Sequence, residues 1–226
     1  MKQIRQHGWY WGIIFCIALE GMAAPEPAGI AIKPSGSKIS ELYIAMLDRD
    51  IQEALKLFDA VTGLLPPPHD PANPLLPVDD RLPSPRTAEL AGAMAFAYSL
   101  PSSKYHQNAL LFTTIEAITR NYWKEAGGNP GRITVLGKPL EGATLAAHLE
   151  PLLYAYARAG QAFKEADRAK FKTWLQQALD SLLSQEPRTL STDAMTWCGT
   201  MALGTRVLDI KEKKYNEAAD RVFGWI

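Results

Sequence analysis

Cysteine is scarce in this sequence of 226 residues, and only Cys16 and Cys198 occur. We expect Cys16 to be removed with an N-terminal signal, which leaves a mature chain with one thiol and no intramolecular disulfide. The mature chain must therefore be stabilised by a hydrophobic core. About 200 residues are enough to bury one core in a single domain.

Metal-binding patterns are also missing. The four histidines are scattered through the chain, and no HxxxH or CxxC spacing occurs. The sequence contains no nucleophile elbow of the form GxSxG, no phosphate-binding P-loop and no glycine-rich dinucleotide fingerprint. We therefore expect neither a bound metal nor another cofactor.

An excess of charge of either sign is absent. The chain has 24 basic and 24 acidic residues, and 22 and 23 remain when residues 1–24 are left out, because these contain Lys2, Arg5 and Glu20. Proteins that bind nucleic acid gain most of their affinity by neutralising phosphates with an excess of positive charge. The near-neutral balance therefore argues against a nucleic-acid partner.

No hydrophobic run is long enough to span a membrane well. Lys2 and Arg5 are followed by the apolar stretch WYWGIIFCIALEGMAA, which ends in small residues. A membrane span needs about 20 apolar residues, and Glu20 interrupts this stretch sooner. The pattern is typical of a secretory signal peptide over residues 1–24. We expect a secreted or periplasmic protein with no stable membrane span after cleavage, beginning with a flexible segment over residues 25–36.

Strand-forming residues are few, and the only β-branched cluster is RITVLG at residues 132–137. Elsewhere apolar residues recur with helical periodicity. The predicted helices alternate between two kinds. Four are amphipathic, over residues 37–61, 104–125, 164–183 and 211–226. Three are apolar or small nearly all round, over residues 86–99, 144–160 and 191–210.

A helix that is apolar all round is buried on both sides, whereas an amphipathic helix covers it from solvent. The third apolar helix, in STDAMTWCGTMALGTRVLDI, has no charge between Asp193 and Arg206, and we expect Asp193 to be its N-cap. The alternation predicts an all-α fold of antiparallel helical hairpins in two layers, a toroid-like (α/α) domain over residues 37–226. The hairpins are too few to close a toroid. We therefore expect an incomplete ring, with truncation at the C-terminus, a C-terminal domain supplied from elsewhere, or self-association.

The two longest connections, residues 62–85 and 126–143, each precede an apolar helix. In an alternating layout both lie on one rim, beside helix N-termini whose unpaired N–H groups favour anionic ligands. The candidate ligand-binding side chains there are Arg81, Arg86, Asn129 and Arg132. The alternative is that these loops are stiff spacers and that Arg86 only flanks a helix start.

His148 and Tyr154 are the candidate proton-transfer residues. Pro151 cannot donate a hydrogen bond to the carbonyl of Ala147, so it kinks the helix or marks its true start. The freed acceptor lies beside His148, which suits a proton-transfer group. The alternative is a buried structural histidine bonded to that carbonyl.

Tyr154 belongs to a stripe with Glu150 and Arg158 at a spacing of four residues. Such a stripe is either a structural hydrogen-bonded line or part of a site in which Arg158 lowers the pKa of Tyr154. Trp197 also has two interpretations, because a tryptophan on an apolar helix is either packed in the core or a platform for a sugar ring.

Three features of the chain resemble those of a known family: the residue pattern of RTAELAGAMAFAYSL and HLEPLLYAYARAG, the hairpin order and the secretion signal. In these features the chain resembles the helical toroid domain of polysaccharide lyases of the alginate lyase and heparinase II/III kind. The resemblance covers roughly residues 37–226. It implies β-elimination from an acidic polysaccharide, with Arg132 or Arg86 on the uronate carboxylate and Tyr154 or His148 moving protons.

Two alternatives stay open beside the lyase. These families typically use an Asn near the start of an inner helix, and Asp193 stands there in this sequence. A glycoside hydrolase built from helical hairpins would need two carboxylates across the cleft, for which the candidates are Glu141, Glu150 and Asp193. The chain is otherwise a non-catalytic helical scaffold or an inactive lyase fragment.

Overall fold

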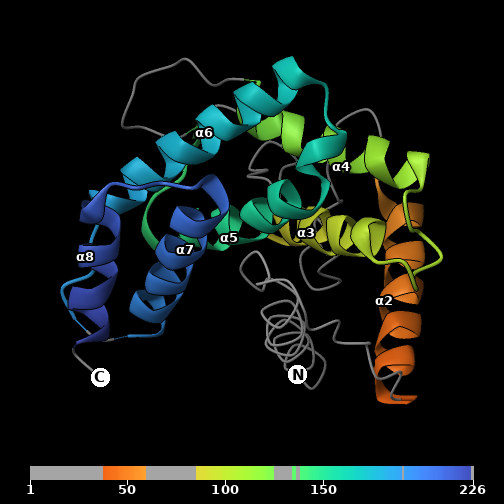
Figure 1. The fold of residues 1–226 in the computed structure, drawn as a ribbon, viewed down its shortest axis with the longest axis horizontal. Helices are drawn as coiled ribbons and strands as arrows, with labels where there is room; N and C mark the ends of the chain where they lie inside the picture. The colour runs from red at the N-terminus through yellow and green to blue at the C-terminus, as the bar shows by residue number, and fades with distance from the viewer. Residues whose placement is uncertain (1–37, 60–84, 125–133, 136–137, 190, 225–226) are drawn as a thin grey trace, which may run out of the picture. The chain divides into compact units, whose positions relative to one another are not determined.

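The computed structural model describes residues 38–59, 85–124, 134–135, 138–189 and 191–224, all of which belong to one compact unit, Lys38–Ile226. The described residues are almost entirely helical, which confirms the predicted all-α class (Figure 1). The helices are α2 (Lys38–Leu57), α3 (Pro85–Ser99), α4 (Ala109–Trp123), α5 (Gly142–Ala159), α6 (Glu165–Leu183), α7 (Thr192–Leu208) and α8 (Lys213–Phe223). The 3-10 turn η2 (Gly160–Ala162) follows α5, and β1 (Thr134–Val135) pairs antiparallel with β2 (Lys138–Pro139).

Helices α3, α5 and α7 lie side by side, with α5 in the middle (Figure 1). Each of α4, α6 and α8 packs against the helix that precedes it, and α4 also contacts α6. Helix α2 packs on α3. The core between these helices is formed by their apolar residues, and its largest fully buried side chains include Trp174, Tyr122, Tyr215 and Phe171.

Two glycines allow close packing between neighbouring helices. A Cβ on Gly92 of α3 would lie 3.0 Å from the carbonyl oxygen of Pro151 in α5. A Cβ on Gly204 of α7 would lie 2.4 Å from Leu179 Cδ1 in α6, a distance that real Cβ atoms do not adopt. At Gly199, also in α7, nothing lies within 4 Å of such an atom. Only the first two positions therefore require glycine for packing.

Pro151 lies inside α5, because the helix already begins at Gly142. Of the two predictions made for this proline, the one that placed the helix start there is wrong. The start of α5 is instead fixed from another helix: Gly142 has φ of +52°, and its N–H donates to the side-chain oxygen of Gln185, which follows α6. A glycine is suited to that left-handed backbone conformation.

The start of α7 differs from the prediction, because its N-cap is Ser191. Ser191 has extended backbone angles, and its side-chain oxygen accepts a hydrogen bond of 3.1 Å from the N–H of Ala194. Asp193 already lies in the first helical turn, where its negative charge suits the helix dipole. The helix is also not buried on every side, since Met195 is 60% exposed.

The connection between α3 and α4 is longer than predicted. Asn108 is the N-cap of α4, and its side chain accepts from the N–H of Leu111 at 3.0 Å, so the helix begins later than residue 104. The turn before it is held by Asp48 of α2. One carboxylate oxygen of Asp48 accepts from Ser103 Oγ at 2.6 Å and the other from the backbone N–H of Lys104 at 3.0 Å.

Candidate functional site

Three of the predicted site residues, Arg81, Asn129 and Arg132, lie outside the described residues. Arg86 is exposed in the first turn of α3. The structure therefore places four predicted site residues: Arg86, His148, Tyr154 and Trp197. His148 and Trp197 are buried in the core, whereas Arg86 is exposed and Tyr154 is half-buried.

His148 is completely buried, and its Nδ1 lies 2.9 Å from the hydroxyl oxygen of Tyr122 in α4. Its Nε2 is buried without a hydrogen-bond partner among the described residues. Burial lowers the pKa of His148 to about 4, which keeps the imidazole neutral, and burial also raises the pKa of Tyr122. The geometry favours the structural interpretation, but the partner is Tyr122 and not the carbonyl of Ala147.

Tyr154 lies on a different side of α5 from His148. At about 100° per residue, six residues place the two side chains about 120° apart around the helix axis. Tyr154 is half-buried. Burial and the charge of Glu150 raise the pKa of Tyr154 to about 12, although Arg158 acts in the opposite direction. The phenol is therefore protonated at neutral pH.

Four titratable side chains form a line across the two helices that pack most extensively, α3 and α5. We call Glu89, Glu150, Tyr154 and Arg158 the α3–α5 stripe; all four are half-buried. Burial raises the pKa of Glu150, and the charge of Glu89 raises it further. Burial also raises the pKa of Glu89, while the nearby Arg86 lowers it. Glu89 and Glu150 thus interact across the two helices, and this interaction is repulsive when both carboxyl groups are ionised.

The other end of the stripe carries the positive charge. The Arg158 guanidinium carbon lies 5.5 Å from the centre of the Phe96 ring, a cation–π contact between α5 and α3. Burial lowers the pKa of Arg158, and the neighbouring Tyr154 acts against that shift. Arg158 nevertheless stays charged, because guanidinium groups do not lose their proton in proteins. The stripe therefore offers carboxyl groups, a phenol and a cation in sequence along its length.

Sequence reasoning missed Glu89, the member of the stripe that comes from α3. Its signal was present, because Glu89 is the only acidic residue in PRTAELAGAMAFAYS. A lone carboxylate in a helix of small apolar residues must remain near solvent or find a polar neighbour. Glu141 and Asp193, the other carboxylates considered for hydrolysis, are both exposed and lie at the starts of α5 and α7.

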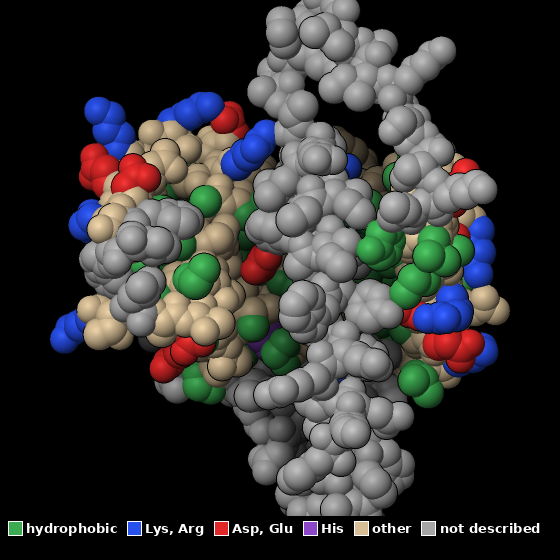
Figure 2. All heavy atoms as spheres, turned by 90° about the horizontal axis from the view of Figure 1, so that it is seen from below, with side chains coloured by type: hydrophobic (Ala, Val, Ile, Leu, Met, Phe, Trp, Pro, Cys, Tyr) green, Lys and Arg blue, Asp and Glu red, His purple; other side chains and the backbone are tan. Residues whose placement is uncertain are grey.

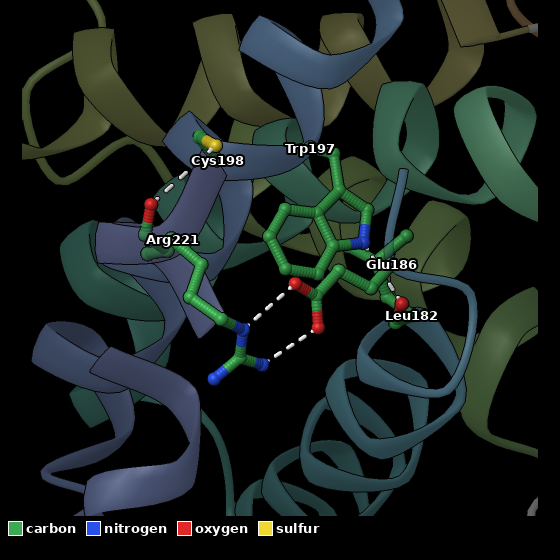
Figure 3. A network of polar contacts seen from close by, with 6 residues as sticks. Leu182, Glu186, Trp197, Cys198 and Arg221 are labelled. Atoms are coloured by element: carbon green, nitrogen blue, oxygen red, sulfur yellow. Dashed lines mark hydrogen bonds and ion pairs between the residues drawn. The ribbon is translucent and has the colours of Figure 1, made fainter. Parts of the chain in front are cut away.

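Trp197 is only 2% exposed, and its indole N–H donates to the carbonyl oxygen of Leu182 at 2.8 Å (Figure 3). Close to it, Arg221 of α8 forms two hydrogen bonds of 3.0 and 2.7 Å with Glu186 (Figure 3). Trp197 presents no open face to a sugar ring, so the geometry favours the core interpretation.

The surface charges of the described residues are mixed. On the face in Figure 2, acidic and basic side chains are interspersed and do not gather into a patch of one sign. Among the described residues, no group of three or more His, Cys, Asp and Glu side chains could hold a metal ion. In the same residues no helix has the length and apolar character needed to cross a membrane.

Comparison with known proteins yields no matching family model, curated sequence or solved structure. The candidate site is therefore argued only from the residues of this chain.

Proposed function

We propose that this chain is a secreted, carbohydrate-active protein with a toroid-like (α/α) fold. In this proposal α3, α5 and α7 are the inner helices, and α4, α6 and α8 form the outer layer. The row formed by α3, α5 and α7 supports this arrangement, as does the packing of each following helix on its predecessor. Secretion is inferred from the signal-like residues 1–24, which lie outside the described part of the chain.

We place the saccharide-binding surface on the α3–α5 stripe. One observation carries this proposal: four titratable groups lie half-buried on two packed helices. Burial shifts the pKa of each, and a neighbour within the stripe also shifts the pKa values of Glu150, Tyr154 and Arg158. Mutually perturbed groups at a partly open surface are more frequent at functional sites than elsewhere. Arg158 would bind the carboxylate of an acidic saccharide, since guanidinium groups pair well with carboxylates.

The first reaction we propose is β-elimination, in keeping with the lyase resemblance. Tyr154 would supply the proton that the leaving glycosidic oxygen needs, because its raised pKa keeps it protonated. Its hydroxyl oxygen is buried in the free chain and would have to become accessible when a saccharide binds. The same shift works against Tyr154 as the base that removes the sugar C5 proton. His148 is completely buried and cannot reach that proton. The stripe carboxyl groups of Glu89 and Glu150 are the groups in the stripe that could act as the base.

Glycosidic hydrolysis is a second candidate, and the pair Glu89 and Glu150 favours it. A general acid in a glycosidase is a carboxyl group that stays protonated closer to neutral pH than usual. Burial and the charge of Glu89 shift Glu150 in that direction. The second carboxyl group then acts as base or nucleophile. Hydrolysis and elimination give different products, so one assay separates them.

The test is to incubate the full chain with alginate, pectate, hyaluronan and heparan sulfate, recording ultraviolet absorbance and new reducing ends together. Elimination produces both a conjugated double bond and a reducing end, whereas hydrolysis produces only the reducing end. Replacing Tyr154 with Phe should abolish elimination, and Glu150→Gln should abolish hydrolysis. Glu165→Gln, an exposed change on α6, is the matched control.

Either activity unaffected by both stripe variants would overturn the placement of the site. If the folded chain binds one of these polymers without producing new ends, the function is saccharide binding without catalysis. If it neither binds nor cleaves any of them, the proposed function is wrong for these four polymers.

A further inference from the structure

Trp123, at the end of α4, has a polar atom that its surroundings do not satisfy. The side chain is 5% exposed, and its Nε1 is buried without a hydrogen-bond partner among the described residues. An indole N–H is only a donor, so it can be satisfied solely by an acceptor. The buried indole of Trp197, by contrast, has a hydrogen-bond partner, because its N–H donates to the carbonyl oxygen of Leu182. A buried donor left unpaired is energetically unfavourable.

Two cations lie over the ring of the same indole and come from different helices. The guanidinium carbon of Arg120 in α4 and the ammonium nitrogen of Lys170 in α6 are each 5.8 Å from the Trp123 ring centre. Arg120 also forms a 2.9 Å ion pair with Glu116. Lys170 has no ion pair among the described residues. The surroundings of the indole therefore carry more positive than negative charge.

We propose that Trp123, Arg120 and Lys170 form a binding site for a sulfate or phosphate group. Such an oxyanion is an acceptor for the indole N–H and a partner for both cations, so it satisfies the donor and the excess charge together. A neutral acceptor would satisfy only the indole. Arg120 and Lys170 are exposed, and their long side chains can turn from the face of the ring towards a ligand at its edge.

The site is separate from the α3–α5 stripe, because its residues belong to α4 and α6. It does not depend on the proposed saccharide chemistry. A sulfate group can come from free sulfate or from a sulfated polymer, and a phosphate group from free phosphate. All three sources present the oxyanion group that the site recognises. A sulfated polymer presents many such groups, whereas each free ion presents one.

The direct readout is the indole N–H resonance of Trp123 in the full chain labelled with nitrogen-15. The Trp123→Phe variant assigns that resonance by removing it. Sodium sulfate, sodium phosphate and dextran sulfate are titrated separately against sodium chloride of equal ionic strength. We expect the Trp123 resonance to shift with the oxyanions and not with chloride, saturating along a binding curve.

Lys170→Gln should weaken the binding by about tenfold, as expected when a charge-assisted contact is lost. Lys172→Gln is the matched control, because Lys172 is an exposed lysine of the same helix and is not one of the two cations over the Trp123 ring. A larger affinity for dextran sulfate that Lys170→Gln removes would identify a polymer as the ligand. Preference for free sulfate or phosphate would identify the small ion.

A shift that chloride reproduces at equal ionic strength would overturn the proposal, because it would reflect general screening. Equal effects of Lys170→Gln and Lys172→Gln would also overturn it. So would an unmoved Trp123 resonance in the presence of all three oxyanions.

Discussion

Tyr122 of α4 and His148 of α5 form a buried pair, with 2.9 Å between the tyrosine oxygen and His148 Nδ1. The pair couples two neighbouring helices in a region from which water is excluded. His148 was a sequence-based candidate for proton transfer. Because its side chain is completely buried, a ligand cannot reach it.

The neutral state of His148 makes stability depend on pH. Its pKa falls from 6.5 to about 4 on folding, so between these values the unfolded chain binds a proton that the folded chain does not. The contribution is fully present above pH 6.5 and is lost as pH falls towards 4. We expect a loss of about 3 kcal/mol from this group, measured by urea unfolding at pH 7, 5.5 and 4.5. An equally steep loss in His148→Gln would contradict this assignment.

Removing the hydroxyl of Tyr122 should destabilise the protein without changing the packing much. In Tyr122→Phe, the buried His148 Nδ1 loses its partner, which costs about 1–3 kcal/mol. Tyr98→Phe is the matched control, since Tyr98 is half-buried and packs against Phe112 through its ring. We expect that control to change the free energy of unfolding by less than about 0.5 kcal/mol. Similar losses in both variants would mean that the hydrogen bond contributes little.

The two glycines of α7 provide a matched test of helix packing. Gly204→Ala puts a Cβ against Leu179 of α6 and should cost about 1–3 kcal/mol through overpacking. Gly199→Ala meets no atom within 4 Å, and alanine is the better helix former by about 1 kcal/mol, so this change should be neutral or stabilising. Thermal unfolding of the two variants separates these outcomes. A harmless Gly204→Ala would place α6 and α7 further apart than described.

The charges within the α3–α5 stripe can be tested through Tyr154. Its pKa is about 12 partly because of the negative charge of Glu150, so Glu150→Gln should lower it. The change should appear in the alkaline titration of the assigned Tyr154 ring resonances. Glu165→Gln, at an exposed position of α6 that does not act on the Tyr154 pKa, should leave that titration unchanged. An unchanged titration in Glu150→Gln would mean that the two side chains do not interact.

Helical periodicity predicted the seven helices of the described residues, because amphipathic and apolar faces are local properties of a sequence. Helix ends were less predictable. The N-cap of α7 is Ser191 and not Asp193, since three consecutive cap-forming residues, Ser191 to Asp193, leave the choice to backbone geometry. The turn before α4 depends on Asp48, a residue more than fifty positions away from Ser103. Contacts of that range leave no periodic signal.

The candidate site was predictable in part. Glu150, Tyr154 and Arg158 follow from their spacing on one helix, because residues four apart share a helix face. Glu89 joins them only because α3 packs on α5, where Gly92 lies close to Pro151. The choice between core and platform for Trp197 depended on one carbonyl group, that of Leu182, which the sequence does not place.

The most direct test of the central claim is calorimetric titration of the full chain with an acidic oligosaccharide, comparing Arg158→Gln with Arg188→Gln. Arg158 belongs to the α3–α5 stripe, whereas Arg188 is an exposed arginine in the connection between α6 and α7. If the stripe binds the saccharide carboxylate, Arg158→Gln should weaken binding about tenfold or more, and Arg188→Gln should leave it unchanged. Equal affinities for the two variants would contradict a saccharide site on the stripe.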